Sequence, residues 1–191
     1  MSKEIKLGLA MIVKFDEPVE IVKRAIDSVK DYMNGMYITV TYDDVMPDDK
    51  NPLVQFLKSY NINITYFKWV EDFSAARNYN ISQIPNDITH FFWMDADDIL
   101  QNAQALPQIA DEMMQFNQAA IYFRYYYLVD LDESGNIREI LIEHKRERLI
   151  RHDGTFKWIG MLHETLIEQR QENVGKFFRP ECIVVHLTTP E

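Results

Sequence analysis

Three aspartates follow directly on an apolar run in the stretch THFFWMDADDIL. Residues 89–94 are mostly aromatic or aliphatic, which predicts a buried β-strand. Asp95, Asp97 and Asp98 then crowd its carboxyl end, where they repel one another unless a cation or hydrogen bonds compensate their charge. Carboxylate oxygens suit a hard divalent ion such as Mg²⁺ or Mn²⁺, which keeps positions open for phosphate groups. The pattern indicates metal-assisted chemistry on a phosphate-bearing ligand, against the simpler alternative that the acids favour the N-terminus of a following helix.

Two residues of the second half could serve the same reaction. Glu164 lies in WIGMLHETL between Leu162 and Leu166, and an apolar setting would make it a stronger base. His186 ends the apolar stretch CIVVH, and its imidazole nitrogen could complete a metal site. Each has a plainer interpretation: Glu164 as a surface glutamate on a short helix, and His186 as an ordinary core or surface histidine. Asp98 likewise has the alternative of capping the helix that follows it.

Arg77 stands among small residues in DFSAARN, on a predicted helix that begins near Asp72. Asp72 and Ser74 are equally good N-cap candidates for that helix. The plainer interpretation of Arg77 is a structural ion pair with Asp95 or Asp43.

The elements that must position these residues alternate between strand and helix in the first half of the chain. Strands are predicted at 5–14, 36–42, 62–69 and 89–94, and helices from Pro18 to a stop at Gly35, at 51–60, from Asp72 and at 102–117. This order predicts a mainly parallel sheet flanked by helices, with ligands at the carboxyl ends of its strands. From Ala119 onward the pattern changes to alternating strands joined by a turn at 132–136, so a more antiparallel part should cover the open edge.

Charge and composition exclude several classes of function. The net charge of −10 argues against a nucleic-acid binder, because a phosphate backbone needs a basic face. Cys182 is the only cysteine and lies in an apolar stretch, which favours a buried side chain and a reducing, cytoplasmic setting. The apolar run at 7–13 is better explained as a first strand than as a signal peptide, and no run approaches the length of a membrane span. An oligomeric state is left open.

Four pieces of the chain carry a family resemblance: LAMIVKFDEP, WVEDFSAARNYNI, WMDADDIL and WIGMLHETL. In this order and spacing they resemble family 2 glycosyltransferases of the GT-A fold, and the terminal IVVHLT is similar to a late histidine segment of those enzymes. The DFSxARN, DAD and GxxHE pieces are closest to small bacterial and phage-type members, including peptide S-glycosyltransferases. The resemblance implies one GT-A catalytic domain over residues 1–191, with a nucleotide-sugar half at 1–118 and an acceptor-side half at 119–191.

The resemblance also implies an activity: metal-dependent, inverting transfer of a hexose from a UDP-sugar, UDP-glucose first, to an unidentified glycan or protein acceptor. Asp97 would bind Mn²⁺ or Mg²⁺ directly, Asp95 would hold it through water or bind the ribose, and His186 would complete the site. Glu164 would be the general base. The residues expected around the donor are Phe15, Glu17, Asp43, Asp44, Asp72, Arg77 and Asp95.

Two departures from the family pattern leave the donor's base and sugar open. Phe15-Asp16-Glu17 stands where members often carry Asn-Glu-Glu, and DDVMPDDKN replaces a stretch usually rich in Ser, Thr and Gly. Two other classes of protein remain as alternatives. A nucleotidyltransferase-like enzyme would also use acids at a strand end, but it normally has a glycine-rich phosphate loop that this chain, with six glycines, lacks. A non-catalytic nucleotide-sugar-binding module is the other.

Overall fold

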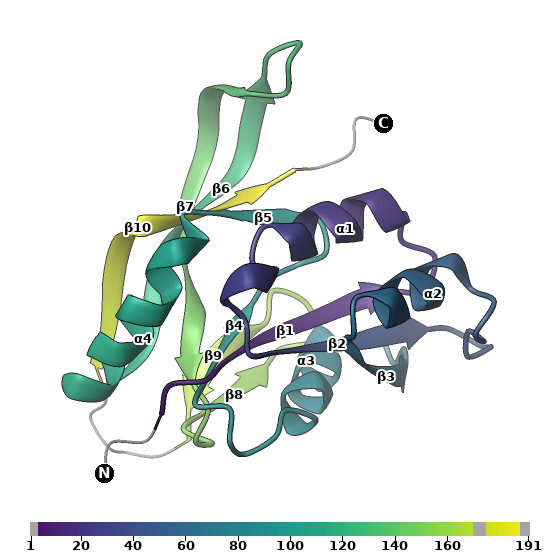
Figure 1. The fold of residues 1–191 in the computed structure, drawn as a ribbon, viewed down its shortest axis with the longest axis horizontal. Coiled ribbons are helices and arrows are strands. Elements are labelled where there is room, and N and C mark those ends of the chain that lie inside the picture. Colours follow the sequence, from purple (N-terminus) through teal and green to yellow (C-terminus); the bar gives the residue numbers. More distant parts are fainter. Residues whose placement is uncertain (1–3, 170–174, 188–191) are drawn as a thin grey trace.

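The computed structural model describes residues 4–169 and 175–187. An eight-stranded sheet in the order β3-β2-β1-β4-β7-β6-β10-β5 runs through the molecule, and helices pack on both of its faces (Figure 1). A separate two-stranded sheet, β8-β9, lies beside α3. No helix of the described residues is long and apolar enough to cross a membrane.

The first half of the chain builds the parallel part of the sheet. Its strands are β1 (Leu7–Lys14), β2 (Gly35–Tyr42), β3 (Asn63–Lys68) and β4 (His90–Trp93), and all of their mutual pairings are parallel. The crossovers are α1 (Val19–Asp27), α2 (Pro52–Ser59) and α3 (Phe73–Ser82). The predicted α/β sheet is therefore confirmed, with boundaries that differ by one or two residues at most strand ends.

The prediction of one helix reaching Gly35 was wrong. Helix α1 ends at Asp27, a short 3₁₀ helix η1 (Lys30–Tyr32) follows, and Gly35 begins β2. The reason is that Asn34 is held against β1: its backbone N–H donates to the Leu7 carbonyl and its side chain accepts from the Leu7 N–H, both at 2.8 Å. The chain is therefore already aligned with β1 one residue before β2 starts.

The helix predicted at 102–117 divides into η2 (Ala103–Ala105) and α4 (Leu106–Gln115), with a proline in the first turn of α4. The antiparallel part follows as a long hairpin of β6 (Gln118–Leu131) and β7 (Ile137–Arg151). β7 joins the parallel half by pairing antiparallel with β4. β10 (Gly175–His186) lies parallel to β6.

Strand β5 (Asp98–Gln101) was not predicted. It pairs antiparallel with β10, so that Asp98 lies opposite His186. Asp98 is therefore a strand residue, and its interpretation as a helix cap was wrong. Four residues are too few to show a strand periodicity in the sequence, and only the pairing with β10 makes this segment extended.

The core has two layers because successive side chains of a strand point to opposite faces of the sheet. Leu9 and Met11 of β1 belong to the larger cluster of buried residues on one face, which also contains residues of α1, α2 and α4. Ala10 points to the other face, where α3 and the small β8-β9 sheet cover Trp93 and Ile150. Strands β1, β2 and β4 are thus largely buried on both sides, which explains their mostly apolar sequences, whereas the edge strand β3 is only partly buried.

Candidate active site

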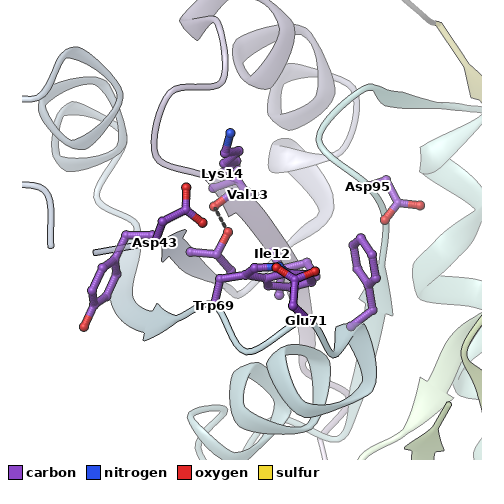
Figure 2. Close-up of a pocket in the computed structure, with 10 residues that line it drawn as sticks. Ile12, Val13, Lys14, Asp43, Trp69, Glu71 and Asp95 are labelled. Carbon is purple, nitrogen blue, oxygen red and sulfur yellow. Dashed lines mark hydrogen bonds between the residues drawn. The ribbon is translucent and has the colours of Figure 1, made fainter. Parts of the chain in front are cut away.

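Two cavities open where the strands of the parallel half end, and they share Phe73 and Asp95 as lining residues. The first, of about 340 Å³, lies beyond the carboxyl ends of β1 and β2 (Figure 2), and its lining includes Lys14, Asp43 and Trp69. The second, of about 620 Å³, lies between the end of β4, strand β7 and the loop after β8. The end of β4 is thus the junction of two adjacent binding spaces.

Asp97, Asp98 and His186 form a group that could hold a metal ion, and two of them, Asp97 and His186, line the second cavity. His186 Nδ1 lies 3.4 Å from Asp97 Oδ1 and 3.2 Å from Asp98 Oδ1, and one ligand atom from each residue lies within 4.8 Å of the others. Hydrogen bonds with both carboxylates raise the pKa of His186 to about 10 against the opposing effect of burial. Two carboxylates and one imidazole suit a divalent ion. Asp95, also expected near the metal, lies outside this group of three.

Asp98 is fixed in place by a buried arginine that the sequence reasoning missed. Arg148 Nη1 lies 3.0 Å from Asp98 Oδ2, and the two side chains are 1% and 0% exposed. The guanidinium also lies over the rings of Trp93, at 4.0 Å, and Tyr125, at 4.5 Å. The backbone N–H of Asp95 donates to the same carboxylate. Arg148 therefore compensates one of the two negative charges in the metal-binding group.

Arg77 joins the acid after β4 to the predicted base. Its Nη2 donates to Asp95 Oδ1 and its Nε donates to Glu164 Oε1, both at 2.7 Å. The guanidinium lies 4.5 Å from the ring centroid of Trp93 and 5.3 Å from that of Trp158. The predicted ion pair between Arg77 and Asp95 is thus confirmed. Burial raises the pKa of Asp95, but Arg77 and Arg148 outweigh it and bring the pKa to about 2.

The loop that carries Glu164 connects β8 (Phe156–Ile159) with β9 (Thr165–Glu168), so the short-helix interpretation was wrong. Gly160 has a φ of +100° and His163 a φ of +55°, which turn the chain tightly around this loop. The setting of Glu164 is ionic rather than purely apolar. Leu162 on one side is exposed, whereas Leu166 on the other is buried.

Helix α3 holds strand β8 and the loop that follows it through three hydrogen bonds. The side chain of Asn78 donates to the Trp158 carbonyl at 2.9 Å and accepts from the Trp158 N–H at 3.0 Å. The Phe73 N–H donates to the Met161 carbonyl at 3.1 Å. Asp72 is the N-cap of α3 and accepts from the Ala75 N–H and the Ser74 hydroxyl, bonds that lower its pKa. The DFSAARN stretch therefore positions Glu164 as well as Asp95.

The other residues expected around the donor do not all line the first cavity. Asp43 lines that cavity directly. Phe15 and Asp44 line a neighbouring hollow of about 720 Å³ together with Asp43. Burial, followed by the charges of Asp97 and Asp16, raises the pKa of Glu17. The predicted residues thus gather at one edge of the sheet, while their individual roles stay predictions.

A row of residues on β7 completes the second cavity and was missed from the sequence. His144, Arg146 and Arg148 all line it. The sequence contains a signal for this row: in residues 144–148, HKRER, the first, third and fifth positions are His, Arg and Arg, and a strand places every second residue on the same face. Tyr127 of β6 also lines the cavity and stacks on His186 with 5.5 Å between ring centroids and an interplanar angle of 9°.

Comparisons with known proteins agree with this architecture. The family model described as glycosyl transferase family 2 matches residues 10–177. Among solved structures, 4-diphosphocytidyl-2C-methyl-D-erythritol synthase from Anaerococcus prevotii DSM 20548 superimposes with a TM-score of 0.52 at 8% identity, over 78% of this chain and 70% of that one. A comparison with curated proteins found no match.

S. aureus TarS is also similar. Its fragment 1–349 gives a TM-score of 0.49 at 14% identity, over 78% of this chain and 47% of that one. The same fragment in complex with UDP-GlcNAc gives 0.47 at 14% identity, over 65% and 35%. Of these structures only the synthase has a TM-score above 0.5, and at 8% identity it bears on the fold alone, whereas the family model covers most of the sequence. The chain belongs to glycosyl transferase family 2, and its sheet and helices form the GT-A fold of nucleotide-diphospho-sugar transferases.

Proposed function

We propose that the protein is a metal-dependent, inverting glycosyltransferase that moves a hexose from a UDP-sugar to a glycan or protein acceptor, with UDP-glucose as the first donor to test. The observation that carries this proposal is that a metal-compatible group and a candidate base line one cavity. Asp97, directly before β5, and His186, at the end of β10, line this cavity together with Glu164 on the loop after β8.

The two joined cavities match the two parts of such a donor. The first cavity has an aromatic and an acidic side chain, Trp69 and Asp43, of the kind that can stack on and hydrogen-bond a nucleobase. The diphosphate would then reach the shared residue Asp95 and the group formed by Asp97, Asp98 and His186. A divalent ion bound there would offset the charge that develops on the departing phosphate. Asp95 is kept ionised by Arg77 and is available to the ribose or to a metal-bound water.

Glu164 would take the proton from the acceptor nucleophile as the new glycosidic bond forms. Arg77 holds one carboxylate oxygen, which orients the side chain, while the residue stays in contact with the cavity. An inverting reaction needs the base on the side of the sugar opposite the leaving group. The acceptor would enter past Met161 and Leu162, which are 64% and 69% exposed at the rim.

A thermal-shift screen of nucleotide sugars with and without Mn²⁺ tests this proposal. UDP-glucose, UDP-GlcNAc, GDP-glucose and UDP are compared, each with the metal or with a chelator. A donor present at about 100 times its Kd stabilises the native state by about 2.7 kcal/mol, which is a readily measured rise in Tm. We expect the largest rise with a UDP-sugar and Mn²⁺ together. Equal shifts with metal and chelator would contradict the metal requirement, and the absence of any shift would contradict the donor class.

The stereochemistry is tested separately by NMR of the product. The sugar in the product, whether it is transferred to an acceptor or slowly to water, should have the opposite anomeric configuration to that of the donor. Retention of the donor's configuration would rule out the inverting mechanism and the role proposed for Glu164.

A further inference from the structure

Three arginines line the second cavity, and two of them already have acidic partners. Arg77 binds Asp95 and Glu164, and Arg148 binds Asp98. Arg146 lies two residues before Arg148 on the same face of β7. Within residues 4–169 and 175–187, its guanidinium has no hydrogen bond or ion pair; it lies 5.6 Å from the ring centroid of Trp93, and its charge adds to those of Arg77 and Arg148 in lowering the pKa of Asp95.

The position of Arg146 makes the lack of a directly bonded acid among the described residues informative. The side chain is half-buried and lines a cavity that also contains Asp95, Asp97 and Glu164. An arginine keeps its charge at any ordinary pH and offers five donors in a planar fork, which matches the oxygens of a phosphate or carboxylate. His144, the next residue in the row, is exposed at the mouth of the same cavity and adds a further donor.

Lys145 shows that the arrangement is specific to one face of the strand. Its ammonium lies on the opposite side of β7, 4.4 Å from the ring centroid of Phe178. Positive charges are therefore present on both faces, but only the face with His144 and Arg146 borders the cavity. Lys145 is consequently a matched control for the loss of one positive charge from this strand.

We propose that Arg146, assisted by His144, binds an oxyanion in the second cavity. This inference rests on the proposed glycosyl transfer and deepens it. The oxyanion is a phosphate or carboxylate group that would otherwise be repelled by the acids of the cavity. It has two sources in such a reaction: the diphosphate of the donor, or an acidic group on the acceptor.

Isothermal titration at low ionic strength distinguishes the two sources. In the first arm, UDP and uridine are titrated with Mn²⁺ into the wild type, Arg146→Gln, Arg146→Lys and Lys145→Gln. If Arg146 binds the diphosphate, Arg146→Gln should weaken UDP binding about tenfold or more and leave uridine unchanged, since a charge-assisted pair is lost. Arg146→Lys should recover part of the affinity, and Lys145→Gln should stay within about twofold of the wild type.

In the second arm, glycerol phosphate is titrated into the same proteins already saturated with UDP and Mn²⁺. A loss of affinity confined to this arm in Arg146→Gln identifies an acidic acceptor as the source. If Arg146→Gln and Lys145→Gln behave alike in both arms, the proposal is overturned.

Inorganic pyrophosphate separates this inference from the proposed function. If the wild type binds no UDP, the proposed donor is wrong, and pyrophosphate titrated into the same four proteins still tests Arg146. A pyrophosphate affinity about tenfold weaker in Arg146→Gln than in the wild type supports the oxyanion site. Equal pyrophosphate affinities in Arg146→Gln and Lys145→Gln overturn it.

Discussion

Replacing Arg77 with glutamine should destabilise the protein by about 3–4 kcal/mol, because it removes one cation from two carboxylates at once. The Arg77 and Glu164 side chains are 8% and 10% exposed, so water can replace only a small part of the lost bond. Breaking such a buried pair costs about 3–5 kcal/mol. Asp95 is 34% exposed and can be hydrated, so the loss of the Arg77–Asp95 pair should add at most about 1 kcal/mol to the destabilisation. Glutamine is uncharged, so the variant also avoids the cost of burying the guanidinium charge, and this gain cancels part of the two losses.

Urea unfolding of Arg77→Gln, Glu164→Gln and the double variant measures the effect. The double-mutant cycle should give a coupling energy of about 1–2 kcal/mol, since the two groups bond directly. Arg138→Gln is the matched control. It removes an arginine that is 70% exposed from its ion pair with Asp130, and it should cost no more than about 0.5 kcal/mol. A coupling energy near zero, or equal losses in Arg77→Gln and Arg138→Gln, would refute the view that Arg77 holds Glu164 in place.

Three further predictions concern the base, the metal and pH. Glu164→Gln should leave UDP-sugar affinity within a few-fold and reduce the transfer rate about 10²-fold or more, and near-normal turnover would remove Glu164 from the role of base. Asp97→Asn should weaken Mn²⁺ binding in a titration with UDP present, and unchanged affinity would show that the metal binds elsewhere. Hydrogen bonds from Lys23 and Lys30 lower the pKa of Asp27 to about 2. Asp27 therefore contributes stability above its ordinary pKa of 3.8 that is lost as the pH falls towards 2. Asp27→Asn should cost about 1 kcal/mol at pH 7 and almost nothing at pH 2 in denaturant unfolding, and an equal cost at both would contradict the pairing.

The sequence by itself determined the order of elements in the parallel half. The strands are recognisable as mostly apolar runs of six to ten residues and the helices as amphipathic segments between them, and both patterns involve only neighbouring residues. The same local information identified Asp72 as a candidate N-cap, which it is in the structure. The acids after β4 could also be located, because a strand end is visible as the point where an apolar run stops. The division into halves at 118 and 119, and the roles of individual site residues, stay predictions.

Only the tertiary structure decided which side chains meet. Asp98 and His186 are 88 positions apart, and Arg77 and Glu164 are 87 apart. Their contacts depend on the pairing of β5 with β10 and on the docking of the β8-β9 loop against α3. Arg148 was overlooked for the same reason, since a charged residue in a strand is expected to be exposed until a buried acid is found opposite it. Periodicity is a property of neighbouring residues, whereas register and burial arise only when distant segments pack together, and the chemistry of this site depends on the second kind of information.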